Sequence, residues 1–278
     1  MEFAGRLREL LWAAALFLTM LGAVLCLMGR CSYATLLGSE GAYFAAGVLL
    51  YALVDGVLGL VAVASAALGA STTVMLKELF TTPRPPGAPP SAVGPGFPSG
   101  HATVTAAFWL GLGFYIRDKR LIAAGAALSL LVAYTRVAVR AHTVPDVIGG
   151  LAVGAAAAAL IAAAAKEWGA AGALIAAGPW SLLASLVATL VWPGYVSAQR
   201  LLGIAAAVTV VGDAAARWSR VLDEHCLSHA PRLAALAASL AFMAAGMAVD
   251  HLVSHVLGFA LFAGGVAVSR TLVCRTRR

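Results

Sequence analysis

The sequence is short of charged and amide side chains. It contains no asparagine and a single glutamine, Gln199, and only 11% of its 278 residues are charged. Soluble domains are about one quarter charged, so this composition excludes an ordinary cytosolic enzyme, a disordered chain and a nucleic-acid-binding protein. The missing amides are typical both of a thermophile and of a GC-rich genome, and the composition does not separate these two origins.

Cysteine is also scarce, and none of the cysteines stands in a Cys-x-x-Cys spacing. We therefore expect free thiols, without a disulfide and without a metal site. A group around Cys226, formed with His225 and His229, lacks a fourth ligand, and we expect neither a metal ion nor another cofactor. The four cysteines are Cys26, Cys31, Cys226 and Cys274.

Apolar residues make up 62% of the chain, and the mean hydropathy is +0.92. Since a helix needs about 20 apolar residues to cross a bilayer, we predict an all-α, polytopic helical membrane protein. We count ten spans, or eight or nine if the short ones do not cross, and place turns at Asp55-Gly56 and Asp250-His251. The predicted spans are 10–28, 41–55, 57–76, 99–116, 121–135, 146–165, 170–192, 201–216, 233–249 and 252–269.

The distribution of basic residues orients these spans. With both termini in the cytoplasm, the basic residues fall on the inner side as the positive-inside rule requires, apart from a few exceptions. The first span is longer than a signal-peptide core and no A-x-A site follows it, so we expect it to remain uncleaved. The exceptions are Arg30, Lys77, Arg84, Arg136, Arg140 and Arg200.

Three polar clusters stand at predicted helix ends on the outer side. The first runs from Lys77 to Arg84-Pro85, and the second is Pro98-Ser99-Gly100-His101. The third contains Thr135-Arg136, His142 and Asp146. Between the first two, residues 81–98 hold seven of the eleven prolines and predict an extended, semi-rigid loop. Such a loop in a compact protein is often a lid or a binding loop.

The residue types in these clusters suit phosphate chemistry. Three cations near a membrane surface form a natural site for a dianion, because Arg forks match phosphate oxygens. Ser99 is placed to cap the following helix, which leaves the N–H groups of Gly100 and His101 for an anion. His142 and Asp146, four residues apart at a helix start, can pair so that the carboxylate orients a nucleophilic imidazole. The cations that we expect at this site are Lys77, Arg84 and Arg136, with Arg140 as an accessory.

Together these clusters resemble the three-part signature of the type 2 phosphatidic acid phosphatase family. The resemblance implies a six-helix core and a metal-independent phosphatase that works through a phosphohistidine. Carried over by position, His142 attacks phosphorus with Asp146 behind it, and His101 protonates the leaving group and then activates water. The implied phosphate-binding residues are Lys77, Arg84, Ser99, Gly100 and Arg136. Thr135 stands where the family usually has Ser, and it keeps the hydroxyl; Pro85 and Arg140 are accessory positions.

These observations predict an integral-membrane hydrolase of lipid phosphates with its active site on the outer face of the cell membrane. We divide the chain into a six-span core, 1–168, and a C-terminal region of about four spans, 169–278, of unknown role. Polyprenyl diphosphate is the favoured substrate, because microbial members of the family commonly use it. Phosphatidylglycerol phosphate, phosphatidic acid or a phosphotransferase reaction are alternatives. The expected partners are the lipid substrate and the bilayer, with no nucleic acid; the oligomeric state, a homodimer included, stays open.

An anion or lipid transporter is the alternative from another functional class. A transporter needs no His–Asp pair, and its helices commonly form internal repeats, of which the sequence shows none.

Gly150-x-x-x-Gly154 fits close helix packing, although 29 glycines in the chain make this pattern unspecific.

Overall fold

The structure is a computed structural model, and it describes residues 2–191. This part of the chain is helical and contains no strand, which confirms the predicted all-α class. The predicted spans beyond residue 191 lie outside the described residues. The helices are α1 (Glu2–Leu27), α2 (Cys31–Ala34), the 3-10 turn η1 (Thr35–Gly38), α3 (Glu40–Leu49), the π-helical turn η2 (Leu50–Val54), α4 (Gly56–Phe80), α5 (Gly100–Ile116), α6 (Lys119–Ala138) and α7 (Val144–Val191).

The first seven predicted spans correspond to helices of the structure. The long α7 covers two of them, because non-helical dihedral angles at Trp168 and Gly169 divide it into two arms. Five segments of the described residues are long and apolar enough to cross a membrane, so this is a multi-pass membrane protein. They are Gly5–Leu27, Val57–Phe80, Lys119–Ala138, Val144–Gly169 and Ala171–Val191.

Local chemistry explains where the central helices begin and end. The Asp55 side chain accepts a 2.8 Å hydrogen bond from the Leu58 amide, so Asp55 caps α4 and the predicted turn at Asp55-Gly56 is confirmed. At its other end α4 stops at Phe80, because Thr81 takes a left-handed conformation with φ 45° and prolines follow. Asp118 caps α6 in the same way, through the amides of the two residues at 120 and 121.

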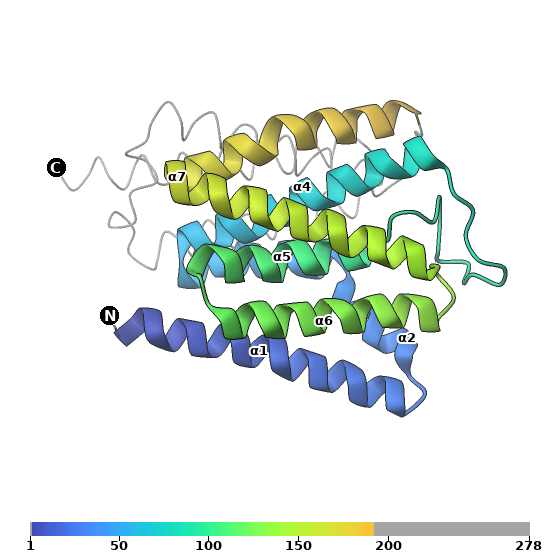
Figure 1. Cartoon of the computed structure of the whole chain (residues 1–278), viewed down its shortest axis with the longest axis horizontal. Coiled ribbons are helices and arrows are strands. Elements are labelled where there is room, and N and C mark those ends of the chain that lie inside the picture. Colours follow the sequence, from blue (N-terminus) through green and yellow to red (C-terminus); the bar gives the residue numbers. More distant parts are fainter. Residues whose placement is uncertain (1, 192–278) are drawn as a thin grey trace.

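Helix α5 lies at the centre of the bundle, in contact with α4, α6 and α7 (Figure 1). Its approach to α7 depends on two glycines. A Cβ atom on Gly150 would lie 2.5 Å from the Ser99 carbonyl oxygen, and one on Gly154 would collide with the Thr103 carbonyl. The Gly150-x-x-x-Gly154 pattern is therefore a close-packing motif, which sets the start of α7 against the start of α5.

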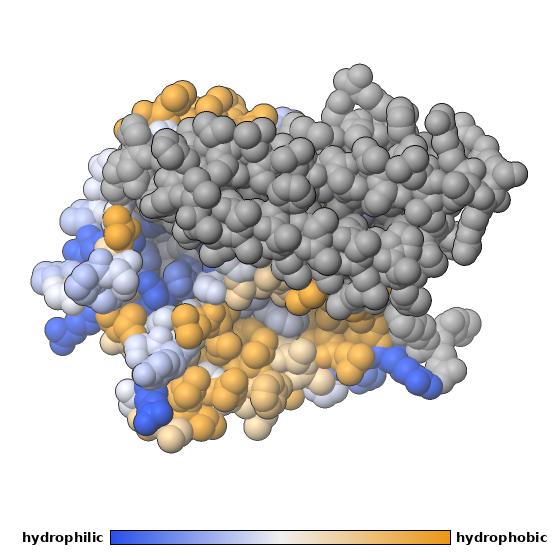
Figure 2. All heavy atoms as spheres, turned by 180° about the vertical axis from the view of Figure 1, so that it is seen from behind, coloured by the Kyte–Doolittle hydropathy of each residue, from blue (hydrophilic) through white to orange (hydrophobic). Residues whose placement is uncertain are grey.

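The bundle has two polar ends separated by an apolar band. Loop 81–99, the α6–α7 turn and α2 gather at one end, whereas the N-terminus, the α5–α6 turn and the bend in α7 gather at the other (Figure 1). At this second end Arg120 pairs with Glu9 at 2.5 Å. Figure 2 shows apolar side chains between polar ends on the face that the grey atoms leave visible. The bundle therefore has two polar ends that carry different sets of residues.

A disulfide joins Cys26 to Cys31, so the prediction of free thiols is wrong for this pair. The physical reason is the turn that ends α1. Gly29 adopts φ 72° there, while the amides of Gly29 and Arg30 bond back to the carbonyls of Cys26 and Leu25. This reversal brings the two cysteine Cα atoms within 4.2 Å. Cys226 and Cys274 lie outside the described residues.

Candidate active site

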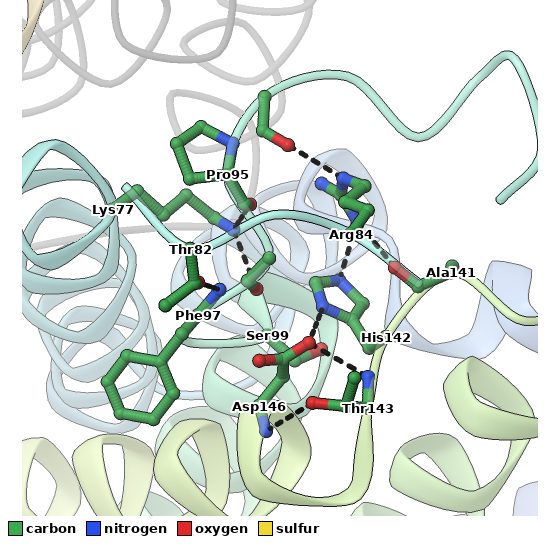
Figure 3. A network of polar contacts seen from close by, with 12 residues as sticks. Lys77, Thr82, Arg84, Pro95, Phe97, Ser99, Ala141, His142, Thr143 and Asp146 are labelled. Atoms are coloured by element: carbon green, nitrogen blue, oxygen red, sulfur yellow. Dashed lines mark hydrogen bonds and ion pairs between the residues drawn. The ribbon is translucent and has the colours of Figure 1, made fainter. Parts of the chain in front are cut away.

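The predicted polar clusters meet at the end of the bundle that carries loop 81–99. Lys77 lies in the last turn of α4, and Ser99 stands before the first turn of α5. His142 lies in the turn between α6 and α7, and Asp146 lies in the first turn of α7. Figure 3 shows these side chains, with Arg84 from the loop, pointing into one polar network. Residues more than 60 positions apart in sequence therefore share one site.

The imidazole of His142 is held between a carboxylate and a guanidinium. Its Nδ1 lies 3.4 Å from Asp146 Oδ2, and its Nε2 lies 3.2 Å from Arg84 Nη1. Because a guanidinium can only donate, Nε2 accepts, and the proton of the neutral ring is on Nδ1, facing the carboxylate. The unprotonated nitrogen, Nε2, is thus the one that faces Arg84.

Asp146 is itself fixed by the start of α7. Its Oδ2 accepts the Thr143 amide at 2.8 Å, and its own amide lies 3.4 Å from Thr143 Oγ1, which forms a capping box. Its main-chain carbonyl also accepts the Ser99 amide at 2.9 Å, linking α7 to α5. The carboxylate therefore cannot turn away from His142 without breaking the helix start.

Burial keeps the His142 imidazole neutral. The side chain is 4% exposed, and its pKa falls to about 2, mainly because burial disfavours the charged ring. The nearby charges of Lys77, Arg84 and Arg136 act in the same direction. A neutral imidazole with an available electron pair is a nucleophile at ordinary pH.

Arg84 is anchored by main-chain carbonyls on both sides of the site. Its Nε bonds to the Gly94 carbonyl at 2.8 Å and its Nη2 to the Val93 carbonyl at 2.7 Å. Its Nη1 also reaches the Ala141 carbonyl at 2.7 Å, one residue before His142. Arg84 thus connects loop 81–99 to the α6–α7 turn.

Lys77 is bound by the same loop. It is 3% exposed, and its ammonium group donates to the carbonyls of Pro95 (2.6 Å) and Gly96 (3.2 Å). The loop is closed on itself at this point, because Thr82 accepts the Gly96 amide through its carbonyl and the Phe97 amide through its hydroxyl. The predicted extended proline-rich loop is therefore an ordered wall of the site (Figure 3).

Two buried polar atoms at the site have no hydrogen-bond partner: Ser99 Oγ and Arg136 Nε. The prediction that the Ser99 hydroxyl caps α5 is wrong. Its backbone has the extended angles of a cap residue, but the side chain makes no capping bond and is fully buried. A buried hydroxyl and a buried guanidinium nitrogen without partners are costly, and an anion is a partner that each of them could take.

The first turn of α5 supplies Gly100 and His101. Ser99 makes no side-chain cap at this helix start, so its hydroxyl does not occupy the first amides of α5. Gly38 of η1 lies against the His101 side chain. A Cβ atom added to Gly38 would lie 3.0 Å from the Cβ atom of His101. His101 and His142 are also within electrostatic range of each other.

Residues 58–170 match the family model of the PAP2 superfamily. This segment contains every residue of the three clusters. This match supports the assignment of residues 58–170 to the PAP2 superfamily. The superfamily implies phosphatase-type activity on lipid phosphates, and hence a phosphoric-ester hydrolase in general. No curated protein and no solved structure matches the chain.

The accessory positions lie at the edge of the network. Thr135 is buried, and its hydroxyl bonds to the Val132 carbonyl at 2.7 Å within α6. Arg140 is exposed with φ 57° and extends toward Gly87 in the loop. Pro85 is half-buried in that loop. None of these three appears in the polar network around His142, within the part of the chain that the structure describes.

The structure adds residues that sequence reasoning missed. Thr143 had a readable signal, since Thr-x-x-Asp before an apolar run is a capping box. The carbonyls of loop 81–99 and the hydroxyl of Thr82 had no such signal in the sequence. Any residue can present a main-chain carbonyl, and the partner of the Thr82 hydroxyl is a main-chain amide. Glu40 was also missed; its Oε1 lies 3.0 Å from the position that a Cβ atom on Gly100 would take.

Residues 2–191 contain no group of three His, Cys, Asp or Glu side chains that could hold a metal ion.

Proposed function

We propose that this protein hydrolyses the phosphate of a membrane lipid through a phosphohistidine formed on His142. One observation carries the proposal: the unprotonated Nε2 of a neutral, buried imidazole faces Arg84, while Nδ1 donates to Asp146. Lys77 and Arg136 are close enough for their charges to act on the same ring. This arrangement supplies a nucleophile, an orienting carboxylate and positive charge for the phosphoryl oxygens in one place.

In the first step, His142 Nε2 attacks phosphorus, and the bond from phosphorus to the lipid oxygen breaks. When the bound phosphate dianion offsets the charge of the neighbouring cations, His101 takes up a proton and gives it to that oxygen, so the lipid leaves as an alcohol, or as a lipid monophosphate when the substrate is a diphosphate. Asp146 stabilises the positive charge that develops on the imidazole. The Arg84 guanidinium moves its Nη1 donor from Nε2 to a phosphoryl oxygen, because the attacking electron pair must be free.

In the second step, water attacks the phosphohistidine. His101, now unprotonated, takes a proton from that water, the phosphorus–nitrogen bond breaks, and the electron pair returns to Nε2. Inorganic phosphate leaves, and both imidazoles are restored. Lys77, Arg84 and Arg136 neutralise phosphoryl charge in both steps, the Ser99 hydroxyl and the Gly100 amide complete the oxygen site, and no metal ion is required by this scheme.

We place the site on the outer face of the membrane. The basic residues of the α5–α6 turn and of the N-terminus lie at the opposite end of the bundle, which the positive-inside rule assigns to the cytoplasm. The Cys26–Cys31 disulfide lies at the site's own end, and disulfides persist on the oxidising side of a membrane. The lipid tail then stays in the bilayer while the phosphate enters beneath loop 81–99, and polyprenyl diphosphate is the substrate that we favour.

A phosphate-release screen tests the function. The purified full chain is offered phosphatidic acid, phosphatidylglycerol phosphate and polyprenyl diphosphate in mixed micelles, beside His142→Ala with an unchanged gel-filtration profile. We expect release from at least one lipid, survival of activity in EDTA, inhibition by orthovanadate, and no release by the variant. Turnover by His142→Ala, or a strict Mg²⁺ requirement, would contradict the mechanism.

A further inference from the structure

A carboxylate from a helix outside the three sequence clusters lies beside the phosphate site. Glu40 is the first residue of α3, and its side chain is half-buried. Its Oε1 lies 3.0 Å from the position that a Cβ atom on Gly100 would take. The starts of α3 and α5 therefore converge, and Glu40 meets α5 at the helix end that is assigned to phosphate.

The segment before Glu40 also contributes to this side of the site. Gly38 is buried, and any Cβ atom there would press on the His101 side chain and on Val132. Glu40 is close enough to Lys77 for their opposite charges to attract. The turn η1 and the start of α3 thus form a fourth wall of the site, with Gly38 beside the proposed acid and Glu40 near a proposed phosphate ligand.

Counting charges shows what Glu40 changes. Apart from His101, whose proton is transferred during the reaction, the three cations and Asp146 sum to +2, which would balance a phosphate dianion, whereas Glu40 lowers the sum to +1. The loose transition state of phosphoryl transfer is metaphosphate-like, and metaphosphate carries a single negative charge. A site of lower charge therefore binds free phosphate, a dianion, less tightly. It weakens the binding of the singly charged group in the transition state by a smaller amount. Rate depends on this difference in binding.

We propose that Glu40 is a specificity-determining residue that sets the charge of the phosphate site and so weakens its hold on inorganic phosphate. The proposal rests on the proposed function for the location of the site. The Glu40 carboxylate repels an anion bound in the ground state at the start of α5, and this repulsion speeds the release of the phosphate product. It therefore acts on KM and on product inhibition together.

The experiment compares Glu40→Gln with wild type in the full chain. Gln keeps the size and removes the charge, so we expect the Ki of inorganic phosphate to fall by roughly tenfold. KM should fall with it, and kcat should not rise. Glu40→Asp, which keeps the charge, should retain a Ki within about threefold of wild type. Glu9→Gln, the same charge change at the far end of the bundle, is the matched control and should leave Ki unchanged.

Two results would overturn the proposal. An unchanged Ki in Glu40→Gln, with only lower thermal stability, would mean that Glu40 merely stabilises the start of α3. A higher Ki would mean that Glu40 supports the cations instead of opposing the anion. Calorimetric titration with orthovanadate compares the anion affinities of wild type and Glu40→Gln without requiring turnover. If no lipid is hydrolysed but vanadate binds Glu40→Gln more tightly than wild type, the proposed function fails and the role of Glu40 stands.

Discussion

Arg84 Nη1 lies 3.2 Å from His142 Nε2, so the proposed nucleophilic nitrogen is covered by a proposed phosphate ligand before substrate binds. The same Nη1 also bonds to the Ala141 carbonyl at 2.7 Å. One guanidinium thus fixes the tautomer of the imidazole and the position of the turn that carries it. In the proposed mechanism, phosphate oxygens compete for these donors, and their arrival frees the electron pair of Nε2.

Replacement of Arg84 by lysine should therefore be a severe change despite the conserved charge. A lysine ammonium cannot bond in one plane to the Val93 and Gly94 carbonyls and also reach the Ala141 turn. We expect kcat/KM for the lipid substrate to fall by roughly 30- to 100-fold. Arg120→Lys, at the opposite end of the bundle, is the matched control. A loss of less than threefold in Arg84→Lys would show that only its charge matters.

The depressed pKa of His142 predicts a pH dependence of stability. An unfolded histidine binds a proton below about pH 6.5, whereas folded His142 stays neutral down to about pH 2. Its contribution to stability is therefore complete above pH 6.5 and is lost as the pH falls from there. Between pH 7 and 5 the loss should be roughly 2 kcal/mol.

Thermal unfolding of wild type and His142→Gln at pH 7 and pH 5 measures this contribution. The wild type should lose more stability on acidification than the variant, because the glutamine does not titrate. Equal losses in the two proteins would mean that His142 is protonated in the folded state as readily as in water.

The contact of Gly150 with Ser99 predicts a packing defect that reaches the active site. A methyl group at Gly150 would lie 2.5 Å from the Ser99 carbonyl oxygen, so α7 must move away from α5 and carry Asp146 with it. Gly150→Ala should cost about 1–3 kcal/mol of stability and lower kcat. Gly41→Ala in α3 is the control, because its methyl group enters open space. Equal thermal midpoints for the two variants would contradict the packing account.

The orientation of the chain can be tested through the Cys26–Cys31 pair. In a variant with serine at the other two cysteines, a membrane-impermeant maleimide should label intact cells only after an impermeant reductant has opened the disulfide. A cysteine at Arg117, at the opposite end of the bundle, should be labelled only after permeabilisation. The reverse pattern would place the site on the cytoplasmic face.

The sequence was informative where one residue type has one physical use. Long apolar runs gave the helices, and Asp55 before a glycine located the break between α3 and α4. His142 and Asp146 could be paired from their spacing, because four residues in a helix start bring two side chains together.

It was not informative where the chain uses its own backbone. The carbonyls that bind Lys77 and Arg84 belong to Val93, Gly94, Pro95 and Gly96, and any residues could present them. The Cys26–Cys31 bond depends on a glycine turn whose geometry the spacing does not reveal. For Ser99 the helix start was right and the cap was wrong, because its hydroxyl is buried without a partner.

The central claim is that phosphate passes through a covalent bond to His142. Its most direct test is rapid quenching of the full chain during turnover of a lipid labelled with ³²P in the transferred phosphate, followed by peptide mapping. We predict an acid-labile, base-stable label on His142 that is absent from His142→Ala and formed more slowly in Asp146→Asn. Full turnover with no trapped label, or a label on another residue, would contradict the account.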